Sequence, residues 1–92
     1  MGTLLDVTNV QAQPGHILLL EFENGEWRRF DMSPYIGQKP WHQLKNSPLF
    51  HKAKVEYGTV VWPGEIDIDP ETLYELSELA ESPAGFQGSA AA

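Results

Sequence analysis

A chain of 92 residues is long enough for one small domain, and its thin core must draw on three Trp, four Phe and three Tyr residues. The absence of Cys excludes disulfides, thiol catalysis and thiolate metal sites. The formal net charge of −7, from thirteen Asp and Glu against six Lys and Arg, argues against direct contact with nucleic acid and with anionic membranes.

The N-terminus lacks the basic stretch and apolar run of a signal peptide, and no apolar run approaches membrane-spanning length. We therefore expect a soluble, cytoplasmic protein.

Two antiparallel hairpins are predicted in the first third of the chain. Residues 4–13 read as a strand whose alternation changes phase at Thr8-Asn9, which indicates a β-bulge, and Pro14-Gly15 follows as a turn. The next strand, residues 16–22, is apolar at four consecutive positions. Such a run predicts a central strand that is covered on both faces.

Asn24-Gly25 is the clearest local signal, since a type I′ hairpin turn requires positive φ at both positions. A loop of only these two residues sets the register of the hairpin and places Leu19 opposite Phe30. One face of the sheet then carries Leu18, Leu20, Phe22 and Trp27, and the other carries Ile17, Leu19 and Phe30.

The middle of the chain predicts short helical pieces and another hairpin. We expect one helical turn at Tyr35-Ile36, then helical segments at 40–46 and 48–53, the second with Ser47 as a candidate cap. Strands at 54–56 and 59–62 flank a turn at Tyr57-Gly58.

The last elements predicted are an alternating stretch and a helix. Ile66 and Ile68 are expected to face the core, and Asp69 to cap a helix from Pro70 to about Ala80. The fold class is therefore α+β: a small antiparallel meander with short crossover helices and one C-terminal helix. We expect one domain over residues 1–81 and a disordered tail over 82–92.

Few residues suggest chemistry. Glu65, Asp67 and Asp69 alternate and so could converge on a hard cation, but the spacing fits solvated side chains and a helix cap better. The histidines (His16, His42 and His51) lie far apart without metal-ligand spacing, and no Ser lies in a nucleophile motif. Arg28-Arg29 point to opposite faces and form no patch. We expect no catalytic residue, cofactor or metal, and no enzyme activity.

The order of these signals resembles a bacterial family, the domain-of-unknown-function family DUF2442. The residues that carry the resemblance are FENGEWRRFDMSPYI (22–36), LKNSPLFHKAKVE (44–56) and VVWPGEIDIDPETLYE (60–75). The resemblance covers residues 4–77 and implies a small antiparallel sheet with packed helices. Some members continue into a helix-turn-helix domain, and some lie beside another small protein in an arrangement like a toxin–antitoxin pair.

Three functions are left open. The leading hypothesis is a non-catalytic protein-interaction or regulatory module, with an unidentified protein as partner. The alternative is a DNA-associated regulator that acts through a partner or a dimer, without direct nucleic-acid contact. The third is a metal-binding protein or enzyme.

The candidate interaction surface consists of Ile17, Leu19, Phe30 and Trp62. In the predicted register the first three form an apolar patch, which a symmetric homodimer would cover unless another part of the chain folds over it. Trp62 is expected to cover the open end of the core near Leu73, or else to serve as an exposed anchor.

Overall fold

The fold is seen in a computed structural model in which residues 5–83 are described. A four-stranded antiparallel sheet has the order β1-β2-β3-β7. Its strands are β1 (Val7–Gln13), β2 (Ile17–Phe22), β3 (Trp27–Asp31) and β7 (Glu78–Ala80). The strand that is last in the described chain therefore pairs with β3.

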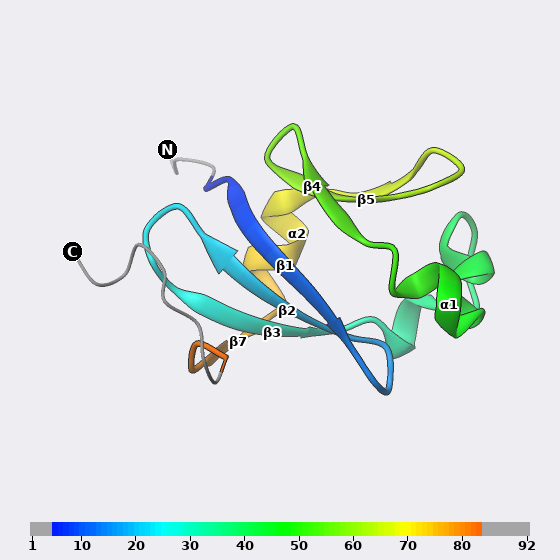
Figure 1. Ribbon diagram of the computed structural model, residues 1–92, viewed down its shortest axis with the longest axis horizontal. Coiled ribbons are helices and arrows are strands. Elements are labelled where there is room, and N and C mark those ends of the chain that lie inside the picture. The colour runs from blue at the N-terminus through cyan, green and yellow to red at the C-terminus, as the bar shows by residue number, and fades with distance from the viewer. Residues whose placement is uncertain (1–4, 84–92) are drawn as a thin grey trace.

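A second antiparallel sheet has the order β4-β5-β6. Its strands are β4 (Lys54–Glu56), β5 (Thr59–Trp62) and β6 (Ile66–Ile68). A helical segment connects the two sheets, with the 3₁₀ helices η1 (Ser33–Tyr35) and η2 (Trp41–Lys45) and the α-helix α1 (Ser47–Phe50). Helix α2 (Pro70–Glu75) follows β6. Figure 1 shows α1 at one end of the molecule and the β2–β3 turn at the opposite end.

One hydrophobic core joins both sheets and the helices. In the first sheet, Leu18, Leu20 and Phe22 alternate with the residues of β2 that face the other side, so they share one face. The second sheet contributes its own inward residues, and η2, α1 and α2 add one buried residue each. The buried members from these elements are Val60, Trp62, Ile66, Ile68, Leu44, Phe50 and Leu73.

The predicted α+β class is confirmed, with both hairpins in place. The strands around Tyr57-Gly58 have the predicted bounds, and the β1–β2 register shifts between Val7 and Asn9, where the bulge was predicted. Ile66 and Ile68 are buried, whereas Asp67 between them is exposed. The alternation of apolar and acidic residues in β6 therefore places its isoleucines in the core, as predicted.

The predicted register of the β2–β3 hairpin is wrong by one residue. The Phe22 amide donates to the Glu26 carbonyl, so the loop contains Glu23 as well as Asn24 and Gly25. Leu18, not Leu19, consequently lies opposite Phe30. A slip of one residue moves side chains to the other face of a strand pair, and it places Phe30 in the core beside Leu18.

The C-terminal helix is shorter than predicted. It ends at Glu75 rather than near Ala80, and residues 78–80 extend along β3. The physical reason is that β3 offers an unpaired ladder, which the chain fills when it turns at Leu76 and Ser77. Leu76 and Leu79, which were expected on the helix face that packs on the core, are 61% and 66% exposed.

The start of α1 also corrects a prediction. The side chain of Asn46, not Ser47, accepts the hydrogen bond from the Leu49 amide at 2.9 Å. Asp69 does cap α2 as predicted, by accepting from the Thr72 amide at 3.0 Å.

No helix within residues 5–83 is long and apolar enough to cross a membrane. The predicted disordered tail falls, from residue 84 onward, outside the described residues.

Candidate functional site

The face of the second sheet that points away from the core forms the candidate site. Lys54, Val61 and Asp67 are cross-strand partners on β4, β5 and β6, so their side chains form one row on this face. Val61 is half-buried between two charged residues. The row therefore has an apolar centre and polar ends.

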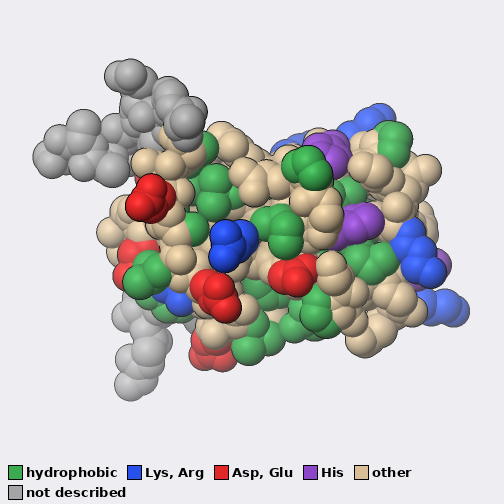
Figure 2. All heavy atoms as spheres, turned by 90° about the horizontal axis from the view of Figure 1, so that it is seen from below, with side chains coloured by type: hydrophobic (Ala, Val, Ile, Leu, Met, Phe, Trp, Pro, Cys, Tyr) green, Lys and Arg blue, Asp and Glu red, His purple; other side chains and the backbone are tan. Residues whose placement is uncertain are grey.

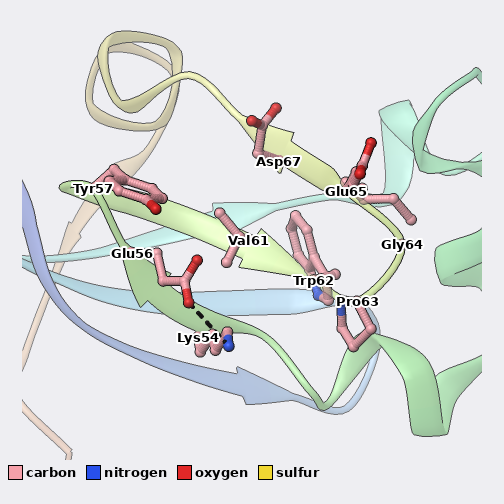
Figure 3. Close-up of a pocket in the computed structure, with 10 residues that line it drawn as sticks. Lys54, Glu56, Tyr57, Val61, Trp62, Pro63, Gly64, Glu65 and Asp67 are labelled. Atoms are coloured by element: carbon pink, nitrogen blue, oxygen red, sulfur yellow. Dashed lines mark ion pairs between the residues drawn. The ribbon is translucent and has the colours of Figure 1, made fainter.

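A groove of about 480 Å³ lies along this face. We call it the Tyr57 groove; its lining comes from β4, β5, β6 and their two connecting turns, namely Lys54, Glu56, Tyr57, Val61, Trp62, Pro63, Gly64, Glu65, Ile66 and Asp67. Figure 3 shows Tyr57 at one end of the groove and Pro63 at the other, with Val61 between them.

Tyr57 is the most distinctive residue of the groove. Its side chain is 96% exposed, and its backbone has a φ of 55°, where a bulky residue is strained. The next residue, Gly58, has a φ of 76°, and its carbonyl accepts a hydrogen bond from the Val7 amide at 2.9 Å. A Cβ on Gly58 would lie 2.6 Å from the Asp6 carboxylate, and the positive φ there strains any residue other than Gly. The turn thus presents the Tyr57 ring to solvent.

The charged side chains of the Tyr57 groove are arranged unevenly. Lys54 and Glu56 form an ion pair along β4, with 3.0 Å between Nζ and Oε2 (Figure 3). Glu65 and Asp67 are exposed on the opposite side of the groove. The titratable side chains of the lining are Lys54, Glu56, Tyr57, Glu65 and Asp67. The groove is therefore suited to holding a ligand by contact and charge.

The structure separates the four residues predicted as an interaction surface. Phe30 and Trp62 are in the core, at 1% and 2% exposure, and Leu19 is buried on the other face of the first sheet at 6% exposure. Ile17 is half-buried and lines a smaller hollow with Arg29, Asp31, Leu76 and Glu78. Because the register prediction was wrong, Ile17, Leu19 and Phe30 do not form the expected patch.

Trp62 lies where the structural interpretation placed it, inside the molecule. Its indole Nε1 donates to the Phe50 carbonyl at 2.9 Å, and its ring stacks on the Phe50 ring with 6.0 Å between centroids. Trp62 is also one of the residues that line the Tyr57 groove.

Candidate metal ligands are not brought together. No group of three or more His, Asp or Glu side chains within residues 5–83 is placed to hold a metal ion. Asp69 is used as a helix cap, and Nε2 of His16 lies 2.8 Å from the Leu44 carbonyl. His51 contacts the Ser47 carbonyl of its own helical turn through Nδ1 at 2.9 Å.

A polar cluster between β3 and α2 was not anticipated from the sequence. The Arg28 guanidinium donates to the Ser77 hydroxyl at 2.7 Å and to Glu26 at 3.0 Å, and it lies 4.4 Å from the centre of the Tyr74 ring. The Tyr74 hydroxyl donates to the same Glu26 oxygen at 2.8 Å. These contacts join Arg28 of β3 to Ser77, the residue that precedes β7. They therefore help to position β7 beside β3.

A basic run is the second feature that the sequence interpretation missed. No Asp or Glu occurs between Asp31 and Glu56, although four of the six cations do. Counting carboxylates along the chain would have found it. We call residues 37–53 the basic lobe; its charged or titratable side chains are Lys39, His42, Lys45, His51 and Lys52, and all five are exposed.

Comparison with known proteins gives a family but no characterised relative. No curated protein and no solved structure matches the chain. A family model described as "Protein of unknown function (DUF2442)" matches residues 7–78, which include every strand of both sheets except part of β7. The resemblance noted in the sequence is thereby confirmed, and the chain belongs to the DUF2442 family.

Proposed function

We propose that the protein is a non-catalytic protein-binding module that holds a segment of another protein in the Tyr57 groove. The observation that carries this proposal is the placement of Tyr57, a 96% exposed aromatic side chain on a strained backbone beside a groove of about 480 Å³. Tyr is enriched among the residues that dominate binding at protein interfaces.

The composition of the groove supports contact binding. Val61 and Pro63 offer apolar surface between Tyr57 and the β5–β6 turn, while Glu65 and Asp67 provide a polar rim. An apolar centre with a polar rim is the usual anatomy of a protein interface. Asn tolerates the positive φ of Tyr57 better than Tyr does, so an exposed aromatic ring on this strained backbone supports a binding role for the ring.

Capture from a native lysate tests this function with a variant that spares the fold. Tyr57→Asn keeps a residue type that tolerates positive φ and removes the ring, so the variant should fold at least as well as the wild type. We expect it to lose the partner that the wild type retains, with an affinity loss of about thirtyfold, as for truncation of a typical hot-spot residue.

The matched control is Leu79→Asn, which removes another exposed apolar side chain from a different sheet. It should retain the partner. Equal retention by the wild type and Tyr57→Asn would show that the groove is not the binding surface. A gel shift at physiological salt and a calorimetric metal titration test the competing regulator and metal-binding functions in the same preparations.

A further inference from the structure

Positive charge is concentrated at one end of this acidic protein. Residues 32–55 contain four of the six cations and none of the thirteen carboxylates, a formal charge of +4. Two cations against thirteen carboxylates, a formal charge of −11, remain elsewhere. In Figure 2, Lys and His side chains gather toward the right end, which the helical segment occupies in Figure 1, while Asp and Glu lie toward the left and centre.

The lysines of the basic lobe are not neutralised by carboxylates of residues 5–83. Lys39, Lys45 and Lys52 make no ion pair with any carboxylate in residues 5–83. The other cations are engaged: Arg28 with Glu26, Arg29 with Glu78 and Lys54 with Glu56. Ion pairing therefore stops at the boundary of the basic lobe.

The backbone beneath these lysines is held by the core. Leu44 and Phe50 are fully buried, and the Phe50 carbonyl accepts from the Trp62 indole at 2.9 Å. Another part of the lobe is held by the Trp41 indole, which donates to the Asp67 carbonyl at 2.9 Å. A lobe with little regular structure is thus fixed at several points, which reduces the entropy lost when a ligand binds it.

The chemistry of the lobe favours an acidic protein segment over nucleic acid. The large apolar side chains that are exposed in residues 5–83 (Tyr57, Leu76 and Leu79) lie outside it, so it offers no fully exposed Trp, Tyr or Phe ring for base stacking; its exposed rings are the imidazoles of His42 and His51. A long polyanion would also meet the formal charge of −10 that the chain carries outside the lobe, whereas a short acidic segment would contact the lobe alone.

We propose that the basic lobe is a second binding surface, which takes a segment of a partner protein rich in Asp and Glu through Lys39, Lys45 and Lys52. It differs from the Tyr57 groove in its charge and in its elements, and the two meet where the Trp41 indole donates to the carbonyl of Asp67, so each surface is tested with its own side-chain variants.

The test is an NMR titration of the full chain with a short peptide of alternating Asp and Glu. Amide shifts should saturate and be concentrated in residues 37–53, and affinity should fall as salt is raised. Lys45→Gln together with Lys52→Gln should weaken binding about tenfold, since each lost charge contact contributes modestly at an exposed site.

The matched control for Lys45→Gln alone is Arg29→Gln, which removes one positive charge outside residues 32–55. It should bind the peptide like the wild type. The proposal is overturned by equal loss in both variants, by shifts centred outside residues 37–53, or by no saturable shift in the wild type. A single-stranded oligonucleotide that binds more tightly than the peptide would also overturn it, in favour of a nucleic-acid surface.

Discussion

The Trp62 side chain joins β5 to α1 in the core. It ends β5, its ring stacks on Phe50 of α1, and its indole N–H satisfies the Phe50 carbonyl. A large aromatic side chain that is 2% exposed contributes more apolar burial than almost any other residue of so small a domain.

Trp62→Ala should therefore lower the free energy of unfolding by about 3–5 kcal/mol, measured by urea denaturation. Trp62→Phe keeps an aromatic ring beside Phe50 but leaves its carbonyl without the indole donor, so a smaller loss of about 1–3 kcal/mol is expected. Val61→Ala, on the neighbouring half-buried position, should cost less than either. An unchanged urea midpoint in Trp62→Ala would contradict the structural role of this side chain.

Glu26 makes the stability of the folded protein depend on pH. Its pKa is lowered from the ordinary 4.5, first by the hydrogen bond from the Tyr74 hydroxyl, partly opposed by desolvation, and then by Arg28. Unfolded Glu26 therefore binds a proton at higher pH than folded Glu26 does. The stability that this difference contributes is present above pH 4.5 and is lost as pH falls through the lower pKa of the folded protein.

Tyr74→Phe removes the hydroxyl that holds this pKa down. We expect its free energy of unfolding to depend less steeply on pH than that of the wild type between about pH 5 and pH 3. Urea denaturation across that range measures the slope. Tyr57→Phe is the control, because it removes a hydroxyl from a fully exposed ring without touching Glu26. Parallel pH profiles for Tyr74→Phe and the wild type would contradict the assigned cause.

At the scale of elements, local sequence signals predicted the hairpins. They failed where a contact between residues distant in the chain sets a strand register or the end of a helix. The Tyr57-Gly58 turn was located because its geometry is set by adjacent residues. The β2–β3 register depended on one extra loop residue, Glu23, and the decisive gain is the burial of Phe30, which lies outside the turn. A turn signal alone does not contain that information.

The predicted end of α2 is wrong for a related reason. Leu73 and Leu76 have helical spacing, but the chain leaves the helix after Glu75 because β3 accepts a fourth strand and Arg28 binds Ser77. Such pairing joins residues about fifty positions apart, beyond the reach of periodicity. The candidate site was missed more completely: the sequence showed Tyr57 as a turn residue, and only the fold places it in one groove with Val61 and Pro63.

At the scale of the whole molecule, the two sheets share one core. Leu18 and Leu20 of the first sheet lie in the same buried cluster as Val60 and Trp62 of the second. The strands of the second sheet contain only three or four residues each, too few to be stable alone. Neither sheet can lose its partner without exposing apolar side chains.

This shared core predicts one cooperative unfolding transition. The indole NMR signals of Trp27, in the first sheet, and Trp62, in the second, should disappear at the same urea concentration, and far-ultraviolet circular dichroism should change with them. Val60→Ala and Leu18→Ala remove fully buried side-chain volume from different sheets. Each should lower the urea midpoint of both indole signals together. The free energy of unfolding should fall by about 2–5 kcal/mol for Leu18→Ala and by less for Val60→Ala. If Val60→Ala shifted the Trp62 transition and left that of Trp27 in place, the sheets would be separate folding units, and a ligand in the Tyr57 groove would stabilise only the second sheet instead of the whole molecule.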